Sequence, residues 1–195
     1  MKVASRSWIE TRPVISVDGI LALGLIGLDV LARLLSPAPN FVPIAGTALF
    51  AGAVLQSRPM AAAVPLVALI LSDSILGYDD WRVMAVVYAA LVFPVVIGMW
   101  GQRFRSPIAF LPLALSSSLI FFATTNLAVW MFSGMYAHDL AGLGACYAMA
   151  LPFLQNTIAG DLFWTSLLFG GYRTARLALA SIDENRARGP APLLR

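Results

Sequence analysis

The sequence predicts an all-α integral membrane protein, a six-transmembrane-helix bundle with a short non-spanning helix between helices five and six. Composition is the first reason: 59% of the 195 residues are hydrophobic and only 12% are charged, whereas a soluble domain carries about 25% charged residues. The second reason is that the apolar residues arrive in long blocks, as expected when lipid rather than water surrounds the helices. A water-soluble core could not bury this much apolar surface.

Six apolar blocks, bounded by proline, glycine, asparagine or charged residues, are the predicted spans. They are Val14–Leu35, Phe41–Leu55, Pro59–Gly77, Val83–Trp100, Pro107–Phe132 and Phe153–Ala178. A helix needs about 20 apolar residues to cross the hydrocarbon core, so the second block is short. It has to lie steeply or be shielded by its neighbours, which favours a packed bundle.

The first block is expected to remain as a helix rather than to be removed as a signal peptide. It contains Asp18 and Asp29, follows a polar segment, and is too long for the apolar region of a signal peptide. Residues 1–13 are then a cytoplasmic N-terminal segment and residues 14–178 the transmembrane domain. Residues 179–195 are predicted to be a disordered, basic cytoplasmic tail, because charges mixed with glycine and proline cannot bury enough apolar area to become ordered.

The segment Ala137–Leu151 is apolar but too short to cross a membrane, and Pro152 follows it. We therefore predict a separate helix there that lies at the surface or re-enters. With six spans and a cytoplasmic N-terminus, all lysine and arginine residues except Arg33 and Arg82 face the cytoplasm, which is the orientation that the positive-inside rule favours. Both termini are thus predicted to be cytoplasmic.

The formal net charge of +3 does not indicate nucleic acid as a partner. The basic residues lie where the topology requires them, so the lipid bilayer is the expected partner. Residues near the C-terminal end, including Arg173 and Arg176, are expected to contact anionic headgroups.

Most ionisable and amide side chains at depth in the predicted spans lie in the outer half of the bundle, and Asp18 is the one ionisable residue at depth in the inner half. Those in the outer half are Asp29, Arg33, Asp73, Asn126, Asn156 and Asp161. A charged side chain at mid-bilayer costs about 3 kcal/mol on insertion scales, so these groups are expected to converge on a cavity that opens to the extracytoplasmic side. Asp29 and Arg33, one helical turn apart, are predicted to form a structural ion pair within their helix. The alternative to a functional cavity is that Asp73 or Asp161 joins this pair in a buried ionic knot that only fixes helix packing.

The outer loops add Tyr78, Trp130, Tyr136 and His138 as candidate substrate-binding residues. Aromatic and polar groups suit the capture of a flat or amphipathic small molecule, although the same residues also suit an interfacial belt. A lone histidine without a second His or Cys nearby is a poor metal signature. Cys146 lies in an apolar stretch and is interpreted as a small buried hydrophobe. We therefore expect no metal and no cofactor.

Several motifs resemble an uncharacterised family of small bacterial membrane proteins. They are Pro39–Ala45, Leu71–Gly77, Phe121–Trp130, Met135–Tyr136, Leu140–Tyr147 and Pro152–Asp161. That family is similar to the substrate-binding S components of energy-coupling factor (ECF) vitamin transporters. The resemblance implies an ECF S-component-like bundle of six helices in the bacterial cytoplasmic (inner) membrane, with cytoplasmic termini and a pocket closed by extracytoplasmic loops.

The resemblance also implies that Asp73, Asn126, Asn156 and Asp161 belong to the characteristic polar set of the family, and it makes the segment 134–152 a pocket lid. Together with Asn40, these four residues are candidate substrate-binding residues. S components that dock on an ECF energising module carry an Ala-xxx-Ala pair on the first helix, and the first span here has none. Docking on such a module therefore stays open as a partner interaction.

The leading functional hypothesis is a membrane protein that binds a small solute for uptake, a vitamin or vitamin precursor, through the outward-facing pocket. One alternative is a solitary corrinoid-binding relative, although such relatives ligate cobalt with a cysteine in the loop that here reads Tyr78-Asp79-Asp80-Trp81. Another is a structural or assembly partner of a second membrane protein. A third is an intramembrane enzyme with Asp73 and Asp161 as acid and base, but no nucleophile-base motif is present, so we expect no enzymatic activity.

Overall fold

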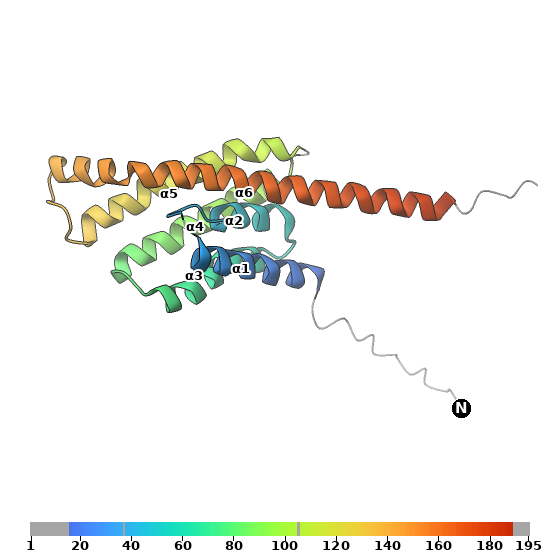
Figure 1. The fold of residues 1–195 in the computed structure, drawn as a ribbon, viewed down its shortest axis with the longest axis horizontal. Helices are drawn as coiled ribbons and strands as arrows, with labels where there is room; N and C mark the ends of the chain where they lie inside the picture. Colours follow the sequence, from blue (N-terminus) through green and yellow to red (C-terminus); the bar gives the residue numbers. More distant parts are fainter. Residues whose placement is uncertain (1–15, 37, 105, 189–195) are drawn as a thin grey trace, which may run out of the picture.

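The computed structural model describes residues 16–36, 38–104 and 106–188, and every regular element in these ranges is a helix (Figure 1). The elements are α1 (Val17–Leu35), α2 (Ile44–Val54), α3 (Arg58–Leu76), α4 (Trp81–Gly101), the 3-10 turn η1 (Pro107–Phe110), α5 (Leu111–Phe132) and α6 (Leu140–Arg188). The predicted all-α fold class is confirmed. The predicted N-terminal segment 1–13 and the end of the tail, 189–195, lie outside the described residues.

Capping side chains set the starts of α3 and α4. The hydroxyl of Ser57 accepts a hydrogen bond from the backbone N–H of Met60 at 3.4 Å, and the Asp80 carboxylate accepts one from the N–H of Arg82 at 2.8 Å. Such caps satisfy N–H groups of the first turn, which have no partner within the helix. Both helices therefore begin slightly before the apolar blocks that predict them.

The short helix α2 lies at the centre of the bundle and packs against α3, α4 and α6. Every residue from Ile44 to Gly52 is buried. A Cβ atom at Gly52 would collide with the backbone carbonyl of Val95 in α4, so the two helices approach as closely as their backbones allow. The prediction that a short second helix is shielded by its neighbours is confirmed.

The other helices surround α2 in two groups. The helices α1 and α3 pack on each other on one side, and α5 packs against α4 and α6 on the other. Figure 1 shows that α1 begins and α6 ends at the same end of the bundle, on the right of the view. We refer to this as the α1-start end, and the connection between α3 and α4 marks the opposite end.

Three helical runs in the described part of the chain are long and apolar enough to cross a membrane. They are Arg58–Leu76, Trp81–Gly101 and Pro107–Phe132. Large apolar side chains on their surfaces, such as Ile70, Val96 and Leu119, are exposed rather than packed in the bundle. Exposed apolar surface of this kind is typical of a lipid-facing helix and costly in water.

The last helix differs from the sequence prediction. The sequence predicts a separate short helix at Ala137–Leu151, whereas a single helix runs from Leu140 to Arg188 with Pro152 inside it. The prediction of a separate helix is wrong. Proline removes only one backbone N–H from the helix, and contacts with α5 hold the turns before it, because the hydroxyl of Tyr147 donates to the backbone carbonyl of Ala123. The helix also continues through residues 181–188, where the sequence predicts disorder.

Candidate functional site

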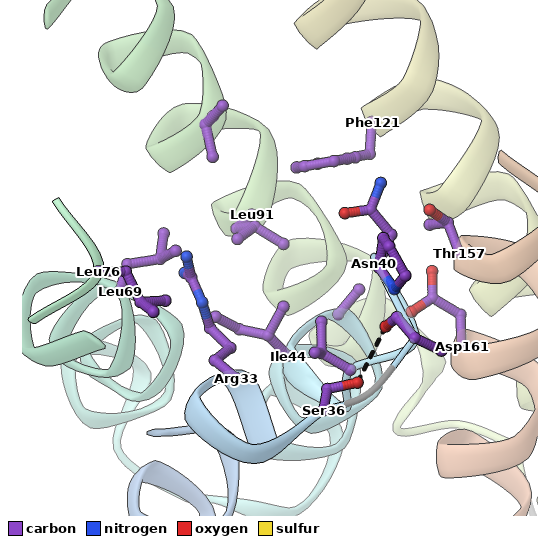
Figure 2. A pocket seen from close by; sticks show the side chains of 15 residues that line it. Arg33, Ser36, Asn40, Ile44, Leu69, Leu76, Leu91, Phe121, Thr157 and Asp161 are labelled. Atoms are coloured by element: carbon purple, nitrogen blue, oxygen red, sulfur yellow. Dashed lines mark hydrogen bonds between the residues drawn. The ribbon is translucent and has the colours of Figure 1, made fainter. Parts of the chain in front are cut away.

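A cavity of about 350 Å³ lies among α1, α2, α3, α4, α5, α6 and the connection between α1 and α2. Its charged residues come from distant parts of the chain, Arg33 from the end of α1 and Asp161 from the middle of α6. Figure 2 shows the Arg33 side chain on one side of the cavity and the Asp161 carboxylate on the other, below the amide of Asn40. Leu91 and Phe121 belong to the apolar lining. The cavity thus offers a cation, an anion and an amide between apolar surfaces.

Arg33 is held in place by Asp73. Its Nη2 lies 2.7 Å from Oδ1 of Asp73, which is almost fully buried in the last turn of α3. The other carboxylate oxygen of Asp73 accepts a hydrogen bond from the hydroxyl of Tyr88 in α4 at 2.9 Å. A guanidinium has five N–H donors, and among the described residues only Asp73 accepts from Arg33, so most of its donors can bind a ligand.

Asp161 has a single hydrogen-bonding partner among the described residues. The hydroxyl of Ser118 in α5 donates to Oδ2 of Asp161 at 2.6 Å, and the residue is only 3% exposed. A buried carboxylate with one donor and no cation beside it is poorly compensated. A hydrogen-bond donor or cationic group on a ligand would therefore interact strongly with Asp161.

The connection between α1 and α2 forms a wall of the cavity through Ser36 and Asn40, and several contacts fix its shape. Asn40 has φ 61°, a left-handed conformation that asparagine tolerates better than most residues. The amide Nδ2 of Asn156 in α6 donates to the backbone carbonyl of Pro39 at 3.0 Å. A Cβ atom at Gly160 would lie 3.2 Å from Cα of Phe41, so the connection packs directly on α6.

A smaller cavity of about 120 Å³ adjoins the first and shares Asn40, Phe121 and Thr157 with it. Asn126 lines this second space, and its Nδ2 donates to the carbonyl of Phe122 one turn earlier at 2.8 Å. The amide oxygen of Asn126 is left to accept from a ligand. Together the two cavities bring Asn40, Asn126 and Asp161 to one region of the bundle.

The aromatic candidates lie outside these cavities. Tyr78 is exposed in the connection after α3, and Tyr136 lies in the connection between α5 and α6. Trp130 donates from Nε1 to the carbonyl of Ala137 at 2.9 Å, and its ring contacts the exposed His138 with a centroid distance of 5.6 Å. None of these four candidates lines either cavity in the described structure.

The predicted ion pair between Asp29 and Arg33 is not formed. Arg33 pairs with Asp73 instead, and the fully buried Asp29 accepts a hydrogen bond from the hydroxyl of Thr47 in α2 at 2.7 Å. The segment predicted as a lid is also placed differently. Residues 140–152 form the first turns of α6, and the connection 36–43 lines the larger cavity in its place.

Sequence reasoning missed the hydroxyl groups that hold the charged residues, namely Thr47, Tyr88 and Ser118. Each lies in an apolar block, and its partner lies on another helix. Serine and threonine in such helices commonly bond to the carbonyl one turn earlier, so their positions alone do not reveal a tertiary role. Only the packing of the helices identifies them.

Within the described ranges, no group of three or more His, Cys, Asp and Glu side chains could hold a metal ion. Cys146 is buried, and its thiol contacts the carbonyl of Asn126 at 3.4 Å. Outside the membrane-spanning segments, hydrogen bonds from the side chain and backbone of Arg82 lower the pKa of Asp80 to about 2. That pair caps α4 and lies away from the cavities.

Comparison with known proteins gives one match. Residues 15–182 match a family described as a family of unknown function, DUF6580. The matched range includes every residue that lines the two cavities. No curated protein and no solved structure matches the chain.

Proposed function

The chain belongs to the DUF6580 family, and we propose that it is a multi-pass membrane protein that binds a small solute from the extracytoplasmic side for uptake. One observation carries this proposal: Arg33 and Asp161, of opposite charge, lie on two sides of one cavity between apolar walls. Small-molecule sites typically combine apolar walls with a few well-placed polar groups, in volumes of about 300 to 1,000 Å³. The cavity of about 350 Å³ falls in this range.

The lining defines the chemistry of the proposed ligand. An acceptor or anionic group would bind the free donors of Arg33, and a donor or cationic group would bind Asp161. Between these groups, Leu91 and Phe121 favour an apolar or aromatic body. A vitamin or vitamin precursor has this combination of a compact ring and polar ends. It is also the ligand class that the resemblance of the sequence motifs to ECF S components implies.

The distribution of charge supports the proposed orientation. Arg58, Arg103, Arg173 and Arg176 lie at or near the α1-start end of the bundle, where α3 begins, α4 ends and α6 leaves the bundle. The positive-inside rule makes this end cytoplasmic. The cavity is lined by the end of α1 and the last turn of α3, so it lies toward the opposite, extracytoplasmic end. The chain would then cross the inner membrane of a bacterium six times, with both termini in the cytoplasm.

The partners of the two carboxylates favour binding over acid-base catalysis. Asp73 is occupied by Arg33 and Tyr88, whereas Asp161 bonds to Ser118. A catalytic acid and base need a shared reacting group between them, and here one of the two is already neutralised by an ion pair.

Ligand-dependent thermal stabilisation of the purified full-length protein tests the proposal. A panel of vitamins and their precursors is screened in detergent, and mass spectrometry identifies small molecules that stay bound during purification. A ligand that binds the folded state raises the melting temperature by mass action. The Asp161→Asn variant keeps an acceptor for Ser118 and is expected to bind the ligand about tenfold more weakly, for a loss of about 1.5 kcal/mol.

Asp183→Asn is the matched control, because Asp183 lies on the same helix, is exposed and lines neither cavity. It is expected to bind the ligand as the unmodified protein does. If no compound of the panel stabilises a well-folded preparation, or if Asp161→Asn binds as well as the control, the proposal is wrong.

A further inference from the structure

A third cavity, of about 680 Å³, lies near the α1-start end of the bundle. It is lined by the end of α2, the connection from α4 to α5, and the C-terminal half of α6. None of its lining residues lines the cavity of the proposed solute site. It is therefore a separate candidate site with its own chemistry.

The inner wall of this cavity is aromatic. The rings of Phe110 and Phe169 stack with a centroid distance of 3.8 Å and an interplanar angle of 17°, and each residue is 5% exposed. Phe104 meets Phe110 edge-on at 6.1 Å. This wall presents a rigid apolar surface to any molecule that enters the cavity.

The outer rim is cationic. Arg173 and Arg176, one turn apart on α6, both line the cavity and are exposed. Neither forms an ion pair with any residue in the described part of the chain, and no described Asp or Glu lines the cavity. Arg176 contacts the ring of Tyr172, which leaves its guanidinium free to bind an anion. The rim thus carries two uncompensated positive charges beside an apolar wall.

In the proposed orientation, the mouth of the cavity would lie at the height of the membrane interface. Trp100, at the end of α4, is exposed, and the guanidinium of Arg103 lies 3.3 Å from the centre of its ring. Gln102, between these two residues, lines the cavity. Tryptophan and arginine side chains gather where the hydrocarbon core meets the headgroups. A molecule in the cavity would therefore have one end among headgroups and the other among acyl chains.

We propose that this cavity binds one anionic phospholipid. The phosphate binds Arg173 and Arg176, and the first part of an acyl chain lies on the wall formed by Phe110 and Phe169. Basic pockets between helices on the cytoplasmic side of a membrane are suited to anionic headgroups. Arginine binds phosphate oxygens in a bidentate manner, which gives the headgroup a defined position. This site rests on the proposed orientation in the membrane but not on the proposed solute-binding function.

Lipid titration of the purified full-length protein in neutral detergent tests the proposal. Phosphatidylglycerol and phosphatidylcholine are compared by thermal shift, and native mass spectrometry counts the lipids retained. Both lipids carry a phosphate, but only phosphatidylglycerol has a net negative charge. Since two arginines contribute, its apparent affinity is expected to be about tenfold or more above that of phosphatidylcholine.

The double variant Arg173→Gln/Arg176→Gln is expected to lower the affinity for phosphatidylglycerol to that for phosphatidylcholine. Arg58→Gln and Arg186→Gln are the controls, because both arginines are exposed and neither lines the cavity. They are expected to leave the preference unchanged. Equal affinity of the unmodified protein for the two lipids, or an equal loss in the controls, overturns the proposal.

Inorganic phosphate and glycerol phosphate separate a lipid from a free anion. Both carry the charge but no acyl chain, so neither is expected to stabilise the protein at concentrations at which phosphatidylglycerol does. If either one matches phosphatidylglycerol, the cavity is a site for a soluble anion and the lipid assignment is wrong. Retention of another membrane protein that requires Arg173 and Arg176, with no lipid preference, would likewise overturn it.

Discussion

Arg33 and Asp73 lie 40 positions apart in the chain and form an ion pair in which Nη2 of Arg33 is 2.7 Å from Oδ1 of Asp73. The pair joins the last turn of α1 to the last turn of α3, and Tyr88 connects α4 to the same carboxylate. Three helices are thus held together at one edge of the cavity of about 350 Å³. The pair positions the cation that the proposed ligand would meet.

Removal of the negative charge by Asp73→Asn is expected to destabilise the protein by about 2 kcal/mol, because it leaves Arg33 with an uncompensated charge. The loss is smaller than for a fully buried pair, since the side chain of Arg33 is 21% exposed. Thermal unfolding in detergent measures it. Asp79→Asn is the control, because Asp79 is exposed in the connection after α3.

A double-mutant cycle separates the ion pair from general damage to the site. The combined variant Arg33→Gln/Asp73→Asn is expected to lose less stability than the sum of the two single variants, because it leaves no unpaired charge. Strictly additive losses would show that Arg33 and Asp73 do not stabilise each other.

Because α2 and α4 are in close contact, a single methyl group added between them is expected to lower the stability of the protein strongly. In Gly98→Ala the new Cβ would overlap the backbone carbonyl of Leu49, which cannot move without displacing the helix. We expect a loss of about 3 kcal/mol, at the upper end of the range for overpacked cores. Gly171→Ala is the control. It has open space around it, and alanine favours a helix over glycine by about 1 kcal/mol, so stability should be unchanged or slightly higher.

The bond from Asn156 to the carbonyl of Pro39 is expected to hold the connection 36–43 against α6. In Asn156→Ala, the loss of one hydrogen bond, worth about 1 kcal/mol, should accelerate amide hydrogen exchange in this connection roughly fivefold. Gln155→Ala, an exposed neighbour, should leave the exchange unchanged. Equal exchange in both variants would show that other contacts determine the shape of the connection.

The stability of the first turn of α4 is expected to depend on pH through the Asp80 cap. Its hydrogen bonds with Arg82 lower its pKa from 3.8 to about 2, so its cap is fully present above pH 3.8. The contribution of a group with a lowered pKa in the folded state is lost as the pH falls, here between pH 3.8 and about 2. The carboxyl carbon shift of Asp80 in nuclear magnetic resonance measures the midpoint. In Arg82→Gln the midpoint should rise toward 3.8, and an unchanged midpoint would contradict the assignment.

Much of the fold could be predicted from the apolar blocks. The ends of α3, α4 and the run Pro107–Phe132 fall within about two residues of the predicted spans. The apolar blocks did not predict that α6 continues through Pro152, because proline is a local signal for the end of a helix. Whether a helix continues past a proline depends on what holds its flanks. Here Tyr147, before the proline, donates to the carbonyl of Ala123, and Asn156, after it, donates to the carbonyl of Pro39.

The site could be predicted only in part. Asn40, Arg33 and Asp161 line the cavity of about 350 Å³ and Asn126 the cavity of about 120 Å³, as expected for polar residues that avoid lipid. The sequence alone could not decide whether the aromatic candidates line a pocket, since the same residues also suit a membrane interface. In the structure Trp130 and His138 contact each other at the connection between α5 and α6 instead.

The sequence by itself determined that this chain forms long apolar helices and that most of the charged residues within its apolar blocks lie in one half of the expected bundle. Both properties follow from the order of residues along one helix and from the cost of polar groups in lipid. The tertiary structure alone decided the partners of those charges. Asp29 and Arg33 are one turn apart on α1, yet they do not pair with each other. Asp29 bonds to Thr47, and Arg33 pairs with Asp73. The rotation and packing of the helices determine which side chains meet, and these depend on contacts between residues far apart in the chain.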